Sequence, residues 1–231
     1  MQRKLQVTGW TFIWLSLFIF SYVGYELFVT DWVNSGIQTE AAEGIDDVFE
    51  QATVPPVQEV SVPETPDSEE RVVEFHSEDS SGEGAEFGVM RVPRIGLEVV
   101  VFSGVTPETL KKGPGNMPGT VLPGQPGNAV ISGHRTTYGR PFFDVDQLQP
   151  GDRIEVETAI GIHVYELREE PFIVAPTDVW VADPREGAWL TLTTCNPKFS
   201  ARERLIVTAE LVSGPNFEYV KALEERLTDL S

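Results

Sequence analysis

The sequence is short of cysteine and of basic side chains. One cysteine among 231 residues excludes an internal disulfide framework, so an extracellular domain of this chain has to be stable through packing alone. Lysine and arginine number 17 against 36 acidic residues, which gives a formal charge of −19. Nucleic acids are bound by clustered positive charge. The composition therefore excludes a disulfide-rich scaffold and argues against nucleic acid as a partner.

Most of the acidity lies in residues 36–86, which hold 15 Asp/Glu and one Arg and so carry −14. The stretch also contains several prolines, and its only aromatic residues are Phe49 and Phe75. Such a composition cannot bury enough apolar surface to offset the entropy of ordering. We predict a disordered acidic linker over residues 36–86, with a root-mean-square span of about 40 Å.

Residues 10–29 form an apolar run with one acid, Glu26, near its end. As a helix the run would be about 30 Å long, the thickness of the hydrocarbon core of a bilayer. Arg3 and Lys4 precede it and acidic residues follow, so the positive-inside rule places the amino terminus in the cytoplasm. We predict a single-pass anchor within residues 1–35, with the rest of the chain outside the cell.

The alternative to an anchor is a cleaved signal peptide. Its apolar region normally has about 7–15 residues, with a cleavage site of small residues close behind. Here the nearest such site, at residues 39–41, lies about ten residues beyond the apolar run. Length and spacing favour the anchor, and in either case the following domain works outside the cell.

From residue 87 the pattern changes to short apolar runs separated by glycine and proline. Turns at intervals of about 8–12 residues are typical of an all-β barrel or sandwich, which we expect over residues 87–214. Residues 215–231 differ, because apolar side chains recur there at three- and four-residue steps. That spacing predicts an amphipathic helix that packs back onto the β domain.

Two histidines lie outside any recognisable motif. His76 falls in the acidic stretch, and His163 falls within a predicted strand with the spacing of an exposed residue. We expect neither to take part in catalysis.

The cysteine stands where the first of two predicted strands ends, within residues 188–211. Leu190 and Leu192 alternate with polar residues, so Cys195 falls on the face away from the core. The apolar positions of the second strand likewise place Arg204 off the core. A lone cysteine is often a small buried hydrophobe, but a positive neighbour stabilises the thiolate that a nucleophile requires. The pattern therefore favours a reactive thiol.

This segment resembles the sortases, the membrane-anchored cysteine transpeptidases of Gram-positive bacteria. The resemblance rests on TLTTC at 191–195, on RLIV at 204–207 and on a histidine after an apolar strand in AVISGHR at 129–135. It covers roughly residues 87–211. The sequences around the cysteine and the histidine are most similar to the class E branch of actinobacteria, although Asn196 stands where many class E members have histidine.

The resemblance implies a closed barrel of about eight strands with short helices, and a cysteine transpeptidase. Cys195 would attack the Thr carbonyl of a Leu-(Ala/Pro)-x-Thr-Gly sorting signal, His134 would transfer protons, and Arg204 would hold the substrate backbone and the oxyanion. It also implies that Thr194 and Tyr138 contact the substrate, with Tyr138 helping to set the preference for Ala at the second position.

The partners that the resemblance implies are proteins with a sorting signal and an amine of the peptidoglycan precursor. It implies no cofactor and assigns no metal ligand. The product would be a protein joined covalently to the cell wall at the outer surface of the membrane.

Three other interpretations can be weighed against this one. Pilus-building sortases often carry an Asp-Pro-aromatic lid before the barrel, and residues 36–86 contain none. An L,D-transpeptidase would have His-Gly a few residues before its cysteine, which is absent here. An anchored β domain that only binds an extracellular ligand remains open, and it predicts that Cys195→Ala keeps all activity.

Overall fold

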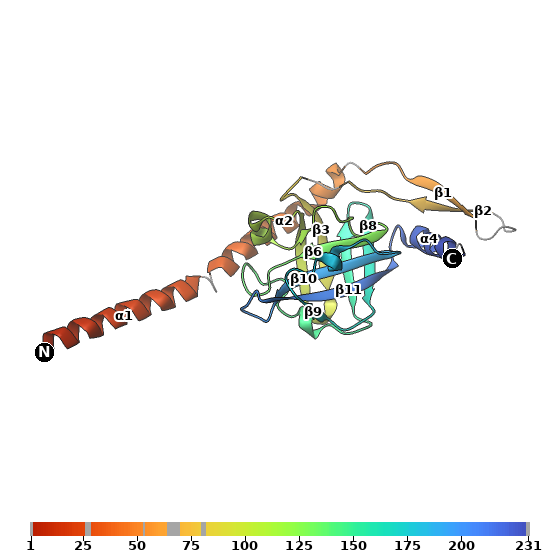
Figure 1. The fold of residues 1–231 in the computed structure, drawn as a ribbon. Helices are drawn as coiled ribbons and strands as arrows, with labels where there is room; N and C mark the ends of the chain where they lie inside the picture. Colours follow the sequence, from red (N-terminus) through yellow and green to blue (C-terminus); the bar gives the residue numbers. More distant parts are fainter. Residues whose placement is uncertain (1, 26–28, 53, 64–69, 80–81, 230–231) are drawn as a thin grey trace.

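The computed structural model describes residues 2–25, 29–52, 54–63, 70–79 and 82–229. A β-barrel forms its centre (Figure 1). Helix α1 (Gln2–Gly24) points away from the barrel, and α2 (Thr30–Gln51) runs up to it. A hairpin of β1 (Gln58–Pro63) and β2 (Glu70–Phe75) lies near the C-terminal helix α4 (Phe217–Asp229).

Eight strands close the barrel in the order β10-β6-β5-β4-β3-β7-β8-β11, with β11 pairing back onto β10. They are β3 (Glu86–Val92), β4 (Leu97–Ser103), β5 (Gly115–Asn116), β6 (Gly127–Ser132), β7 (Arg153–Thr158), β8 (Gly161–Leu167), β10 (Ala188–Asn196) and β11 (Glu203–Ser213). The short β9 (Phe172–Val174) pairs with β11 beside the ring. The predicted closed barrel of about eight strands is confirmed.

Short helices connect the strands. They are η2 (Pro93–Ile95), α3 (Pro107–Lys112), η3 (Val145–Gln147) and η4 (Val179–Ala182). The N-cap of α3 is Thr106, whose hydroxyl accepts a hydrogen bond from the Thr109 backbone N–H at 3.3 Å. Together with a proline in its first turn, this cap makes a six-residue helix possible.

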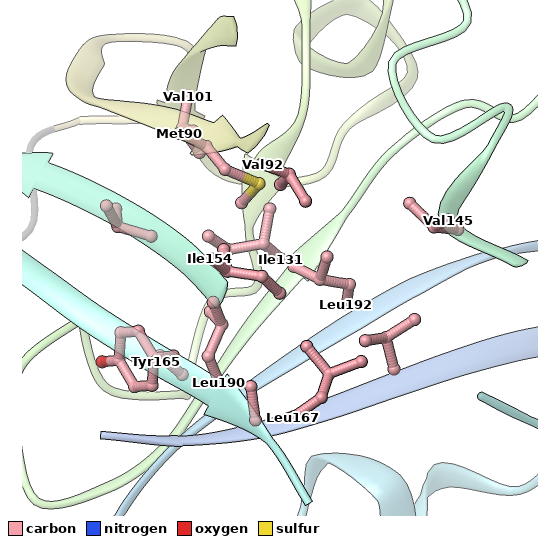
Figure 2. Close-up of a cluster of buried hydrophobic side chains, with 14 of the residues drawn as sticks. Met90, Val92, Val101, Ile131, Val145, Ile154, Tyr165, Leu167, Leu190 and Leu192 are labelled. Atoms are coloured by element: carbon pink, nitrogen blue, oxygen red, sulfur yellow. The ribbon is translucent and has the colours of Figure 1, made fainter. Parts of the chain in front are cut away.

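Alternating side chains fill the barrel. Met90, Ile131, Ile154 and Leu190 come from four different strands and are fully buried. Figure 2 shows these side chains directed toward one another, with Tyr165 at one edge of the cluster. Each fully buried aliphatic side chain of this kind contributes about 1.5–3 kcal/mol through removal from water, so the barrel is stable without a disulfide.

His163 departs from the sequence-based expectation of exposure. Its side chain is 0% exposed and lies on the same inward face of β8 as Tyr165 and Leu167, while Ile162 takes the outward position. The strand alternates as expected, but with the opposite phase. Polarity alone predicts an outward position for His163. The barrel interior accommodates it because the Thr158 hydroxyl lies beside the imidazole as a polar partner.

The acidic stretch is not the disordered linker that its composition predicts. Helix α2 packs against β3 and β4 through Ala41 and Ile45, which lie four residues apart and join a cluster with Val89, Val100 and Phe102. A four-residue spacing puts both side chains on one face, and this narrow apolar face is lost when composition is averaged over the stretch. Residues 58–63 and 70–75 add the β1–β2 hairpin, whereas residues 53, 64–69 and 80–81 lie outside the described residues.

Hydrogen bonds fix α2 in place. The Gln38 side-chain amide donates to the backbone oxygens of Val100 and Lys112 and accepts from the Val100 N–H at 2.7 Å. At the start of the helix, the Asp31 carboxylate accepts from the Gly139 N–H at 3.0 Å and pairs with Arg140 at 3.1 Å. The helix therefore contacts the loop that follows β6.

No helix within the described ranges combines the length and apolarity that crossing a bilayer requires. The predicted span over residues 10–29 includes residues 26–28, which lie outside the described residues. The membrane anchor stays a prediction.

Within residues 215–231, where the sequence predicts an amphipathic helix, residues 217–229 form α4, and residues 230–231 lie outside the described residues. Val220 is buried in the barrel core, and Ala222 packs against Val73 of β2. The Tyr219 and Phe75 rings lie 4.6 Å apart. One helix thus connects the barrel to the hairpin.

Candidate active site

The register of three neighbouring strands brings the predicted catalytic residues to one end of the barrel. Strands β6 and β10 are parallel, with Ser132 opposite Thr193, so His134 and Cys195 each lie two residues beyond that pair. Strands β10 and β11 are antiparallel, with Cys195 directly opposite Arg204. Directly opposed residues share a face of a sheet. A thiol, an imidazole and a guanidinium therefore come from three adjacent strand ends.

Two hydrogen bonds extend the β6–β10 pairing toward the cysteine. The Gly133 N–H donates to the Thr193 oxygen at 3.1 Å, and the Thr194 hydroxyl donates to the Gly133 oxygen at 2.7 Å. Thr194 is 4% exposed, so its hydroxyl is already used inside the protein. This placement argues against the predicted substrate contact of Thr194, whose side chain instead fixes the backbone next to His134.

Cys195, the one cysteine of the chain, is a free, half-buried thiol. The side chain of His134 is also half-buried, and its ring centroid lies 5.0 Å from that of Tyr138 at an interplanar angle of 41°. Burial lowers the pKa of His134 below its usual value. The imidazole is therefore neutral in most molecules at neutral pH, and once protonated it is a stronger acid than a solvated histidine.

Tyr138 lies beside His134 and is half-exposed, and its predicted contact with the substrate stays a prediction. Its φ of 52° is in the left-handed region, as is the φ of 50° at Arg140, which non-glycine residues adopt at a cost of about 1–3 kcal/mol. The contacts of Asp31 with Gly139 and Arg140 help to hold this loop.

Arg204 uses only part of its guanidinium within the protein. One nitrogen, Nη1, donates to the backbone oxygens of Ala201 and Glu203, each at 3.0 Å. Among the described residues, its other N–H groups have no hydrogen-bond partner. Arg204 is half-buried beside the cysteine strand, so these donors remain available to a bound carbonyl or oxyanion.

A sequence model of the sortase domain matches residues 90–212, which is more than half of the chain. This chain belongs to the sortase family. It is 32% identical over 147 residues to sortase SrtE1 of Streptomyces coelicolor, which covers 56% of this chain and 41% of that protein. The chain thus spans about two fifths of that relative.

Solved structures agree. Sortase E from Streptomyces avermitilis is 40% identical and covers 59% of this chain and 94% of its own, with a TM-score of 0.54. A Clostridium perfringens sortase C with the C-terminal cell wall sorting motif is 27% identical and covers 58% and 74%, with a TM-score of 0.54. The resemblance to class E sortases is confirmed.

The loop between β9 and β10 begins next to Arg204, because Val174 pairs with it. Asn128 holds this loop, since its side-chain amide donates to the Val181 and Asp183 oxygens at 3.0 and 3.1 Å. The Trp180 ring stacks on that of Phe172 at 6.1 Å. The loop therefore starts beside the guanidinium.

Sequence reasoning missed Arg135, the residue directly after His134. Its guanidinium is 3% exposed and contacts the peptide of the cysteine. The sequence signal for Arg135 is its place within the motif GHRTTYGRP, where no surface role accounts for an arginine. Asn196, noted only as a departure from class E, turns out to be its partner at 2.6 Å.

Proposed function

We propose that this sortase is a cysteine transpeptidase that attaches secreted proteins to the cell wall. The observation that carries the proposal is the register that places Cys195 opposite Arg204 and His134 at the level of Cys195 on the neighbouring strand. Nucleophile, proton carrier and anion-binding donors at one half-exposed corner are what two successive acyl transfers require.

In the first transfer, the Cys195 thiolate attacks the Thr carbonyl of a Leu-(Ala/Pro)-x-Thr-Gly signal. The carbonyl oxygen becomes an oxyanion that accepts from the free N–H groups of Arg204, whose fixed planar donors suit this charge. Protonated His134 gives its proton to the departing glycine amine, the C–N bond breaks, and a thioester remains on Cys195. The lowered pKa of His134 favours this donation.

In the second transfer, an amine of the peptidoglycan precursor attacks the thioester. Neutral His134 takes the proton from the attacking nitrogen, the C–S bond breaks, and Cys195 leaves as a thiolate. The target protein ends with an amide bond to the wall precursor. The protonated imidazole and the thiolate are then restored for another cycle.

The membrane anchor belongs to the same proposal. Residues 10–29 would span the bilayer with the amino terminus in the cytoplasm, and the barrel would work on the outer surface. Support comes from the apolar run and from the basic residues that precede it. Protease added to intact cells should remove the barrel while leaving a short membrane-bound fragment.

The activity is tested with the full chain in detergent, a Leu-Ala-x-Thr-Gly peptide and a peptide amine, followed by mass spectrometry. We expect a thioacyl adduct on Cys195 and a ligated product, both lost in Cys195→Ala. A parallel Leu-Pro-x-Thr-Gly peptide measures the preference at the second position. If the wild type forms neither adduct nor product while Cys195→Ala still binds the peptide equally, the chain is a binding domain and the proposal is wrong.

A further inference from the structure

The side chain of Arg135 connects the loop that carries His134 to the strand that carries Cys195. Its Nη1 donates to the Asn196 Oδ1 at 2.6 Å and lies 3.4 Å from the Cys195 backbone oxygen. Its Nη2 pairs with the Asp146 carboxylate at 2.9 Å. Because Arg135 is the next residue after His134, these contacts restrain the backbone beside the histidine.

Asn196 passes this connection on to the third strand. Its side-chain oxygen accepts from Arg135, and its side-chain nitrogen donates to the Glu203 carboxylate at 2.9 Å. Asn196 and Glu203 are direct partners in the β10–β11 pairing, one position beyond Cys195 and Arg204. The chain Arg135–Asn196–Glu203 therefore runs alongside the row formed by His134, Cys195 and Arg204.

Stability is a poor explanation for this arrangement. Arg135 is 3% exposed, and its Nε has no hydrogen-bond partner among the described residues. Burying a guanidinium has a desolvation cost that a paired carboxylate only roughly returns, and an unpaired buried donor adds to that cost. Its acidic partner, Asp146, is 39% exposed and shared with Lys198 at 3.4 Å. The Arg135 guanidinium is instead buried where its contacts can fix the position of the His134 loop relative to the Cys195 strand.

We propose that Arg135 is a positioning residue that acts through Asn196 and the Cys195 carbonyl to set the separation of the His134 imidazole and the Cys195 sulfur. This inference rests on the proposed function, since it gives Arg135 a role in the reaction of that site. A misplacement of about 1 Å between reacting groups can cost about 100-fold in rate, so the effect of losing the contact is measurable.

The test uses the full chain in detergent with Arg135→Gln, Arg135→Lys, Asn196→Leu and the double variant Arg135→Gln/Asn196→Leu. Arg168→Gln is the control, because Arg168, just after β8, pairs with carboxylates of β8 and β11 that lie away from the site. Each protein is measured for kcat and KM with the peptide and amine, for thermal unfolding, and for the pH dependence of Cys195 alkylation by iodoacetamide.

We expect Arg135→Gln to lower kcat by about 10- to 100-fold with KM within twofold of wild type. Its alkylation profile should move toward that of His134→Ala, because a misplaced imidazole resembles a missing one. Arg135→Lys keeps the charge but not the fork of donors and should fall between Gln and wild type. The double variant should be no worse than the poorer single one, since both changes break the same contact.

Two results would overturn the inference: a wild-type alkylation profile and kcat in Arg135→Gln, or a loss of kcat that follows the loss of melting temperature with the profile unchanged. Should Arg135→Gln fail to fold, Asn196→Leu decides, because it removes the same contact without touching the buried charge. If the wild type does not turn over the peptide, the proposed function fails. Alkylation still reports on Arg135 in that case, and an unchanged profile would sink the positioning role as well.

Discussion

The two histidines of the barrel lie near opposite ends of β6 and differ in almost everything except the direction of their pKa shift. His134 follows the end of the strand, half-exposed beside Tyr138 and level with Cys195. His163 lies against Gly124, three residues before the strand begins, and is fully buried. Burial lowers the pKa of both, that of His163 to about 4 with a further contribution from His76.

The surroundings of His163 are built to enclose it. A Cβ at Gly124 would lie 2.1 Å from the imidazole, and the φ of +84° at this glycine also excludes most side chains. The ring lies 3.3 Å from the Thr158 hydroxyl. A lowered histidine pKa therefore does not mark a reactive site by itself. Exposure at a strand end beside a thiol and a guanidinium is what separates His134 from His163.

The largest effect on activity is expected from substitutions at the end of β6 where His134 and Cys195 lie. Cys195→Ala should abolish thioacyl formation, because no sulfur remains to form the thioester, and His134→Ala should lower kcat/KM by about 10²- to 10⁴-fold. Both residues are half-exposed, so thermal unfolding should change little. His163→Gln is the matched control and should keep kcat/KM at a temperature well below its melting point. Equal losses of activity in the two histidine variants would break the comparison.

A second prediction concerns the guanidinium beside the thiol. Arg204→Lys keeps the charge but loses the planar donors, and removal of a preorganised oxyanion donor costs about 10²- to 10³-fold in kcat. We expect a loss in this range in single-turnover acylation. Arg202, exposed in the same turn, gives the control Arg202→Lys. An Arg204→Lys enzyme with full activity would show that positive charge alone is sufficient.

The buried imidazole of His163 gives a prediction about stability and pH. The folded-state pKa of His163 lies below its unfolded value, so its contribution to stability is complete above about pH 6.5 and is lost as pH falls toward 4. The loss is about 3 kcal/mol. Denaturant unfolding at pH 7 and pH 4.5 should show a steeper decline in wild type than in His163→Gln. Parallel curves would refute this account, because Glu78 and the other acids are common to both proteins.

The smallest effect is expected on the outer side of the barrel, where α2 docks. Gln38→Ala removes three hydrogen bonds to the backbone and should lower the free energy of unfolding by about 1–2 kcal/mol. Glu40→Ala, on the exposed side of the same helix, serves as the control. Protection of the Val100 amide in hydrogen exchange gives a local measurement. No change at this amide would mean that α2 does not stay docked in solution.

Much of the barrel follows from the sequence because its strands alternate and its turns are marked by glycine and proline. It could also be predicted that His134, Cys195 and Arg204 lie at the same end of the barrel, since each motif stands at a strand end. The phase of β8 could not, because His163 and Ile162 exchange the faces that polarity suggests. Predicting the docking of α2 would have required knowing that β3 and β4 offer apolar residues on their outer face, and that Val100 and Lys112 offer carbonyls beside them.

The network around Arg135 was equally hidden. Arg135 contacts Asp146 and Asn196, and Asn196 in turn contacts Glu203. These three residues come from separate segments, and no local pattern relates them. The ring contact of Tyr138 with His134 joins residues only four apart in sequence, and the substrate contact of Tyr138 stays a prediction. The motif alone predicts that Thr194 contacts the substrate. Alternation along β10 instead turns its side chain inward, next to Gly133.

The hydrogen bond of Asp31 with Gly139 and its ion pair with Arg140 attach the first turn of α2 to the barrel. If residues 10–29 span the membrane, these contacts keep the loop after β6 near the outer end of the span, since α2 begins at Thr30. A disordered tether over residues 36–86 would instead let the barrel move away from the lipid. A site held near the bilayer reaches only those partners that also come close to it.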